Sequence, residues 1–203
     1  SYREDWVFRT TYDWNSRYFF EYNGAYNGSE KFSPDNRFAF FSSGALGWMI
    51  SEEPFMKYLR EHKIVDMMKL RASYGEIGDD NVGDRFLYMT QWAYGGKTQL
   101  GTTASDKESI YTWYRESAVG NPNVHWEKVK KVNFGLDYGF LGGLITGAVD
   151  FFHDTRSDIL VSGSDRSIPS YFGQTAPTAN LGKVTTSGYE LEVKFNKVFA
   201  NKM

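Results

Sequence analysis

The stretch WVFRTTYDW, residues 6 to 14, alternates strictly between two kinds of side chain. Successive side chains of an extended strand point to opposite faces, so this alternation predicts a β-strand whose two faces differ in polarity. The first face is mainly aromatic and carries Trp6, Phe8, Thr10, Tyr12 and Trp14. The opposite face is mainly polar and carries Val7, Arg9, Thr11 and Asp13. The strand is therefore expected to separate two different environments.

The alternation returns in six further runs along the chain. The tight turn Asn15-Ser16 joins the first run to the second and predicts a hairpin. The six runs are residues 17 to 26, 37 to 50, 66 to 74, 126 to 140, 144 to 162 and 184 to 197. The pattern predicts an all-β, antiparallel fold with about seven long strands.

Two segments depart from this period. Residues 52 to 62 have apolar side chains at helical spacing, with Ser51 as a possible N-cap and Pro54 in the first turn, and they predict a short helix. The region from 75 to 124 is rich in Gly, Asp and Asn and is interpreted as an elaborated loop. Two short strands are expected inside this loop, at residues 86 to 94 and 108 to 114.

The composition argues against several classes of protein. The 203 residues include 18% aromatic residues, 20 Gly and 5 Pro, and yet the mean hydropathy is negative. The net charge is −2 and the basic residues are dispersed, which argues against a nucleic-acid surface. The absence of Cys excludes disulfides, a thiolate metal site and a Cys nucleophile. No run is long enough for a spanning helix, and the start resembles neither an initiating Met nor a signal peptide, so we expect a fragment of a larger protein.

Alternating strands fit either a soluble sandwich or a membrane barrel, which differ in the environment of the apolar face. The runs span about 9 to 15 residues, as a tilted strand needs to cross a bilayer. The connections also alternate between compact and long, polar segments, as in outer-membrane barrels. The compact ones are residues 15 to 16, 51 to 64 and 141 to 143, and the long ones are 27 to 36, 75 to 124 and 163 to 182. The pattern favours a membrane barrel and leaves a soluble β domain as the alternative.

Aromatic residues near the ends of the runs support the barrel. Trp and Tyr concentrate where a membrane meets water, whereas a soluble core would favour rings at the centres of strands. The predicted aromatic belt comprises Trp6, Trp14, Tyr18, Trp48, Tyr74 and Tyr138.

Four segments in this order resemble the C-terminal barrel region of SusC/RagA-type TonB-dependent outer-membrane receptors. They are GWMISEEPF (47 to 55), MMKLRASYG (67 to 75), NPNVHWEKVKKVNFGLDYG (121 to 139) and NLGKVTTSGYELEV (180 to 193). The resemblance extends over nearly the whole chain. It implies that residues 1 to 203 are part of the wall of a barrel of about 22 strands, with residues 75 to 124 as an extracellular loop.

The resemblance also implies a function and partners. Such receptors import a nutrient, usually a glycan or an oligopeptide, across the outer membrane of a Gram-negative bacterium, in which the barrel is a multi-pass protein. A SusD-like surface lipoprotein serves as the lid, and energy arrives through TonB. The N-terminal plug and the TonB-contacting segment are not present in this sequence. The alternatives are a soluble all-β glycan-binding module and a passive porin or adhesin barrel.

Acidic residues and histidines offer only weak candidates for chemistry. The adjacent Glu52 and Glu53 point about 100° apart on a helix, so favourable charge at a helix N-terminus explains them better than catalysis. The segment GEIGDDNVGD (75 to 84) lacks the spacing of an EF-hand, and a polar loop is favoured over a calcium site. The histidines, His62, His125 and His153, are scattered along the chain and lack metal-ligand spacing. With no catalytic order of residues either, we predict no enzyme, no cofactor and no metal.

Two groups of side chains are candidates for contacts with ligands. Aromatic residues of the long loop could stack on sugars or touch the lid, or could simply pack the loop hairpin. They are Trp92, Tyr94, Tyr111, Trp113 and Tyr114. Charged residues on the polar faces could contact the plug or a substrate, and cross-strand pairing explains them equally well. They are Arg9, Asp13, Arg17, Glu21, Lys69 and Arg71.

Overall fold

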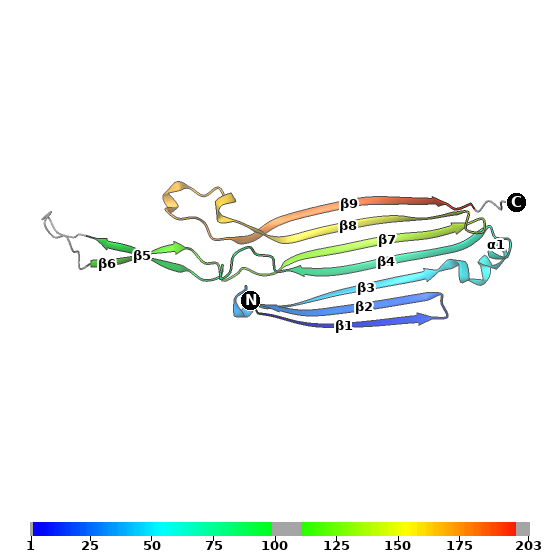
Figure 1. The fold of residues 1–203 in the computed structure, drawn as a ribbon, viewed down its shortest axis with the longest axis horizontal. Coiled ribbons are helices and arrows are strands. Elements are labelled where there is room, and N and C mark those ends of the chain that lie inside the picture. The colour runs from blue at the N-terminus through cyan, green and yellow to red at the C-terminus, as the bar shows by residue number, and fades with distance from the viewer. Residues whose placement is uncertain (1, 99–110, 198–203) are drawn as a thin grey trace, which may run out of the picture.

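The computed structural model describes residues 2–98 and 111–197, which form a seven-stranded antiparallel sheet and a separate two-stranded hairpin (Figure 1). Neighbours in the sheet follow the order β1-β2-β3-β4-β7-β8-β9. The wall strands are β1 (Arg3–Trp14), β2 (Tyr18–Ser29), β3 (Phe38–Met49), β4 (Val65–Asp79), β7 (Glu127–Phe140), β8 (Ile145–Val161) and β9 (Ala179–Phe195). The hairpin consists of β5 (Gln91–Thr98) and β6 (Tyr111–Ala118). The predicted all-β class and the seven long strands are confirmed.

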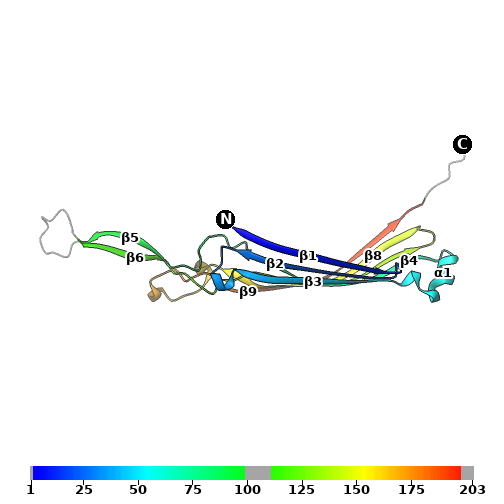
Figure 2. The ribbon, with the colours of Figure 1, turned by 90° about the horizontal axis from the view of Figure 1, so that it is seen from below.

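The sheet is a curved single layer (Figure 2). Each consecutive pair of wall strands is antiparallel, and β1 and β9 form the two open edges of the described sheet. No helix within the described ranges is long and apolar enough to cross a membrane. A sheet that is neither closed nor covered by a second layer is what a part of a larger barrel would look like.

The connections divide by length between the two ends of the sheet (Figure 1). The end that carries α1 has the compact connections between β1 and β2, β3 and β4, and β7 and β8. The opposite end has the long connections, which include η1 (Pro34–Asn36), the β5–β6 hairpin, η4 (Gly163–Asp165) and η5 (Ser170–Phe172). We refer to these as the short-turn end and the long-loop end.

The predicted helix over residues 52 to 62 is wrong in extent. The segment contains the 3-10 turns η2 (Ile50–Glu52) and η3 (Pro54–Met56), and the helix α1 spans only Lys57–Glu61. Glu53 is extended, with φ −74° and ψ 149°, because a residue before proline is sterically driven out of the helical region. Ser51 lies within η2 and does not act as the predicted N-cap; α1 has no side-chain cap.

Several strand boundaries differ from those predicted. The wall strand expected to end at residue 74 continues to Asp79, and the last one begins at Ala179. Both extensions are rich in glycine and polar residues, so alternation could not reveal them. The hairpin strands are displaced from residues 86 to 94 and 108 to 114, of which 108 to 110 lie outside the described residues.

The pairing register places the apolar side chains of successive strands on one face. Leu46 pairs with Ala72, Ala72 with Phe134, and Phe134 with Phe151. Phe151 in turn pairs with Tyr189 on β9. Because paired residues point to the same side, these residues form one continuous surface, which we call the apolar face. Most charged residues of the same strands lie on the opposite, polar face; Glu76 and Lys130, which pair near the long-loop end, share the register of the apolar face.

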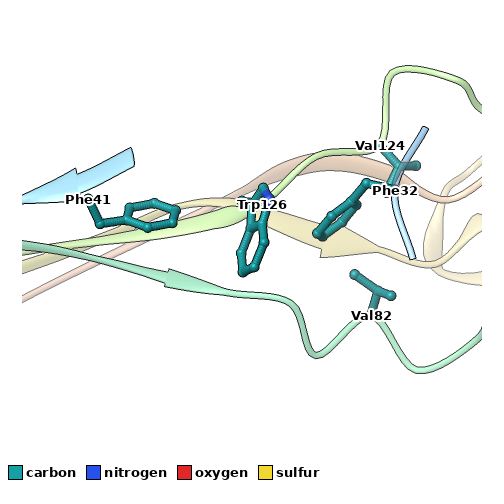
Figure 3. Close-up of a cluster of buried hydrophobic side chains, with 5 residues drawn as sticks. All are labelled: Phe32, Phe41, Val82, Val124 and Trp126. Atoms are coloured by element: carbon teal, nitrogen blue, oxygen red, sulfur yellow. The ribbon is translucent and has the colours of Figure 1, made fainter. Parts of the chain in front are cut away.

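The buried core, whose side chains are drawn in Figure 3, comes from residues at the long-loop end and not in the middle of the sheet. It comprises Phe32, Phe41, Val82, Val124 and Trp126, which we call the loop-base core. The ring of Trp126 lies 5.2 Å from that of Phe32 and 5.7 Å from that of Phe41. These residues come from β3 and from the β2–β3, β4–β5 and β6–β7 connections, so the core joins the bases of separate loops.

The loop-base core fills a place where two wall strands diverge. Pairing between β3 and β4 covers only Ser43 to Met49, and the first residues of β3 have no partner on β4. Phe41 instead covers Gly78 of β4, where an added Cβ would meet the phenyl ring at 2.0 Å. A glycine is therefore required at residue 78 for the ring to close the gap.

Candidate transport wall and loop surface

The apolar face is exposed over its whole length. The exposed fractions are 68% for Trp6, 61% for Leu46, 56% for Phe134 and 67% for Leu191. Contiguous apolar surface on this scale marks a surface that contacts something other than water. From Trp6 to Trp14 the chain makes eight steps of about 3.3 Å, or about 20 Å along the normal at a tilt of about 40°, which is close to the apolar band of a membrane barrel.

The predicted belt residues occupy different heights on this face. Trp14, Tyr18 and Trp48 are neighbours at the short-turn end, with ring centroids 5.8 and 6.4 Å apart. Tyr138 pairs with Met68 near the same end, and Trp6 pairs with Tyr26 near the opposite end. Tyr74 pairs with Gly44, which pairs with Tyr22, and so lies at mid-height. The belt itself stays a prediction.

Ion pairs tie the strands together on the polar face. The Arg71 guanidinium on β4 donates to Asp137 on β7 at 2.8 and 2.9 Å and to Asp150 on β8 at 3.1 Å. Arg9 on β1 donates to Glu21 on β2 at 2.9 Å. Arg9, Glu21 and Arg71, three of the polar-face candidates, are therefore engaged in cross-strand pairs.

The remaining polar-face candidates have other contacts. The Lys69 ammonium lies 4.7 Å from the centroid of the Phe19 ring, a distance at which a cation and an aromatic face attract. Asp13 accepts a hydrogen bond from the Ser16 N–H at 2.9 Å and so stabilises the first turn. Arg17 faces the carboxylate of Glu53 at 3.9 Å.

Glu53 fixes the short-turn end to the apolar face. One of its oxygens, Oε1, accepts the Tyr18 hydroxyl at 2.6 Å and the Trp48 indole N–H at 3.0 Å. The hydrogen bond from Tyr18, followed by that from Trp48 and the charge of Arg17, holds the pKa of Glu53 below its ordinary value. Glu53 does lie at the N-cap position of η3, as expected, but its side chain makes no cap hydrogen bond and instead binds Tyr18, a partner 35 residues away that no sequence pattern indicates.

The neighbouring Glu52 forms an ion pair with Arg60, whose guanidinium also donates to the Ser51 carbonyl at 3.3 Å. Glu52 and Glu53 thus serve separate contacts, as expected for side chains that diverge.

The carboxylates of the acidic segment from 75 to 84 bind different partners and do not converge on one point. Asp80 accepts hydrogen bonds from Ser29 at 2.9 Å and from Arg3 at 3.2 Å. Asp79 accepts from Arg156 at 3.1 Å. Among the described residues, no three His, Cys, Asp or Glu side chains are grouped so that they could hold a metal ion. The carboxylates of Asp79 and Asp80 bind cationic and hydroxyl groups of β1, β2 and β8, which are not the direct neighbours of β4.

A buried carboxylate beside the loop-base core was missed by the sequence reasoning. Glu127 is 4% exposed, accepts the Arg156 Nε–H at 3.0 Å and accepts the Leu160 backbone N–H at 2.9 Å. The adjacent His125 is fixed by Asn180, which accepts the His125 N–H at 3.1 Å and donates to its carbonyl at 2.8 Å. The only available signal was a charged residue between Trp126 and the alternating run that forms β7.

The candidate aromatic residues of the hairpin divide between its two faces. Trp92, Tyr94 and Tyr114 share one face, since Trp92 pairs with Glu116 and Tyr94 with Tyr114. The Tyr94 and Tyr114 rings meet edge to face at 5.9 Å, yet 57% and 64% of these side chains stay exposed. We call Trp92, Tyr94 and Tyr114 the hairpin aromatic face.

The other two candidates do not join that face. Trp113 lies over Gly95, where an added Cβ would meet its ring at 2.4 Å, so Trp113 packs the hairpin itself. Tyr111 begins β6, and its side chain lies outside the described part. The hairpin extends from the long-loop end away from the sheet (Figure 1).

A single antiparallel layer with one apolar and one polar face, short turns at one end and long loops at the other defines a segment of a transmembrane β-barrel wall. The family model described as TonB dependent receptor-like, beta-barrel, matches residues 4–201. The chain belongs to this TonB-dependent receptor family.

The chain is similar to two curated receptors. It is 34% identical to the TonB-dependent receptor SusC of Bacteroides thetaiotaomicron over 91% of this chain, and 27% identical to the TonB-dependent receptor P3 of Formosa agariphila over 94%. The alignments cover 18% of each of these receptors, so the chain spans less than a fifth of their length.

Among solved structures, the RagAB peptide importer in the closed-closed state matches with a TM-score of 0.78 and 23% identity. This match covers 98% of the present chain and 20% of the other. At this identity the match supports the fold alone.

Proposed function

We propose that the chain forms part of the barrel of an outer-membrane importer that takes up a nutrient with energy delivered through TonB. The observation that carries the proposal is a two-faced wall in a chain of the TonB-dependent receptor family. The apolar face would meet lipid, and the polar face would line the lumen. In this arrangement the short-turn end is periplasmic and the long-loop end is extracellular, with residues 75 to 124 as its most elaborate loop.

The chemistry of the polar face suits passage without covalent reaction. Its charges are already balanced across strands, as in the Arg71 pairs with Asp137 and Asp150, so a solute meets a wall with few unpaired charges. The nutrient is a glycan or an oligopeptide; one solved relative is described as a peptide importer.

The hairpin aromatic face is the candidate contact for the lid or the substrate. Trp92 and Tyr114 present more than half of their side chains to solvent at the far end of the molecule from the short turns. Exposed rings of this kind stack on sugar rings or fill pockets of a protein partner. The partner that we propose is a SusD-like surface lipoprotein.

The function is tested in the bacterium with the full-length receptor. Uptake of labelled oligosaccharides and labelled peptides is compared between the parent, a receptor deletion and a strain without TonB. We expect one substrate class to enter only when both the receptor and TonB are present. Uptake that persists without TonB would favour a passive porin, and a receptor that fractionates without membranes would favour the soluble module.

The lid contact is tested by co-purification. Trp92→Ala with Tyr114→Ala should reduce recovery of the lipoprotein with the receptor, while Tyr171→Ala, at a residue 90% exposed in another long loop, should not. Equal recovery from both variants would rule out the hairpin aromatic face as the lid contact.

A further inference from the structure

A hollow of about 750 Å³ lies on the apolar face toward the short-turn end. Its lining is almost wholly apolar and includes Leu46, Trp48, Leu70, Ala72, Phe134 and Leu136. Ala72 pairs with Leu46 on one side and with Phe134 on the other, so a small side chain stands between two large ones. The hollow therefore has room for an elongated apolar group over Ala72.

A cation, Arg17, lies in the turn next to the short-turn end of this hollow, is linked to its lining through Glu53, and is not itself among the residues that line the hollow. The rings of Tyr18 and Trp48 border it, and their polar atoms both donate to Glu53 Oε1. Arg17 approaches the other carboxylate oxygen only to 3.9 Å. Within the described part of the chain its guanidinium donates no hydrogen bond, and about a third of its side chain, 32%, is exposed.

We propose that this site binds one glycerophospholipid of the periplasmic leaflet, with an acyl chain in the hollow over Ala72 and the phosphate at the Arg17 guanidinium. The inference rests on the proposed function, because it takes the short-turn end as periplasmic. A guanidinium offers paired donors that match a phosphate, and Trp and Tyr prefer the level of the headgroups.

The contacts of Glu53 make the site suited to a lipid that has an apolar chain and an anionic headgroup. Its carboxylate holds the Tyr18 and Trp48 rings by their polar ends, so their apolar parts remain turned toward the hollow. The same carboxylate keeps Arg17 close to the boundary instead of in bulk solvent. A glycan would find only apolar groups in the hollow, whereas an acyl chain finds no unpaired polar group to desolvate.

The test uses the full-length receptor reconstituted in nanodiscs of equal parts phosphatidylethanolamine and phosphatidylglycerol, then transferred to detergent for native mass spectrometry. The wild type should retain a bound phospholipid. Ala72→Phe, which fills the hollow, should abolish retention. Arg17→Gln, which removes the charge-assisted contact, should lower occupancy by about tenfold. Thr10→Phe adds the same ring on the apolar face outside the hollow and should leave occupancy unchanged.

A second lipid, diacylglycerol, distinguishes the contribution of the apolar hollow from that of Arg17. It should be retained weakly by the wild type and equally weakly by Arg17→Gln, because it lacks the phosphate. Heat-modifiable migration on gels verifies that each barrel is folded; if Ala72→Phe does not fold, Arg17→Gln decides alone. The proposed site is overturned if folded Ala72→Phe or Arg17→Gln retains as much phospholipid as the wild type. It is also overturned if Thr10→Phe loses as much phospholipid as Ala72→Phe. TonB-dependent uptake by the wild type, measured in parallel, reports on the proposed function independently of this result.

Discussion

Trp126→Ala should destabilise the long-loop end locally and leave the strands of the wall folded. Trp126 is 2% exposed, and its ring packs against Phe32 and Phe41. Its indole N–H also donates to the Arg37 carbonyl at 3.1 Å. A buried Trp removes about 150–250 Å² from water, worth about 4–6 kcal/mol at about 25 cal/mol per Å². Truncations of this kind cost about 3–5 kcal/mol, so we expect a loss of about 4 kcal/mol in local stability.

Hydrogen–deuterium exchange of the full-length receptor measures this loss. A cost of about 4 kcal/mol corresponds to faster exchange by up to roughly a thousandfold at the amides around Phe32, Val82 and Val124. The strands near the short-turn end should exchange as in the wild type. Trp92→Ala is the matched control, because a Trp that is 63% exposed should cost within about 0.5 kcal/mol. Equal protection in the two variants would refute the reasoning that the loop-base core holds the loops together.

Two further predictions concern the contacts at the two ends of the sheet. Gly78→Val should destabilise the long-loop end by about 1–3 kcal/mol, because its Cβ would meet the Phe41 ring at 2.0 Å; the same exchange experiment should detect it, and unchanged protection would contradict the tight fit. Glu53→Gln should lower the thermal midpoint near neutral pH. The folded pKa of Glu53 lies below its ordinary value of 4.5, so the contribution of its charge is present above pH 4.5 and is lost as the pH falls through the folded value. The gap between wild type and variant should therefore close in acid, and a gap that is constant with pH would exclude a role for the charge.

The strands of the wall were predictable because each one carries its own signal. A run such as residues 6 to 14 alternates whichever neighbours it has, since lipid and lumen impose the period on every strand separately. The alternation is absent where the two faces of a strand no longer differ in polarity. The extension of β4 through Gly75 and Gly78 is therefore not predicted by the sequence pattern. The predicted helix is longer than α1 because helical periodicity carries no information on the restriction that Pro54 places on the backbone of Glu53.

The contacts that fix the two ends were not predictable from patterns. Glu53 meets Tyr18, and Trp126 meets Phe32 and Phe41, across separations that only the register of β1 to β7 defines. Trp113 and Tyr114 are consecutive in β6 and take opposite faces by alternation alone, but their partners on β5 depended on an irregular register that places Gly96 opposite Trp113. Local alternation predicts which face a residue takes within one strand, but a bulge changes that assignment for every residue beyond it.

The two ends of the sheet are stabilised in different ways, and the difference follows from their surroundings. In the wall the apolar side chains face outward, so their burial depends on lipid and contributes nothing to an internal core. The long loops extend past the wall strands and bury apolar surface among themselves, which Phe32, Val82, Val124 and Trp126 do where the strands diverge. The short turns bury little and rely on directed hydrogen bonds, such as those to Glu53 and the Gly143 N–H to Asp66 at 2.8 Å. Changes in lipid should therefore act on the wall and its short-turn rim, while substitutions in the loop-base core should act on the long loops.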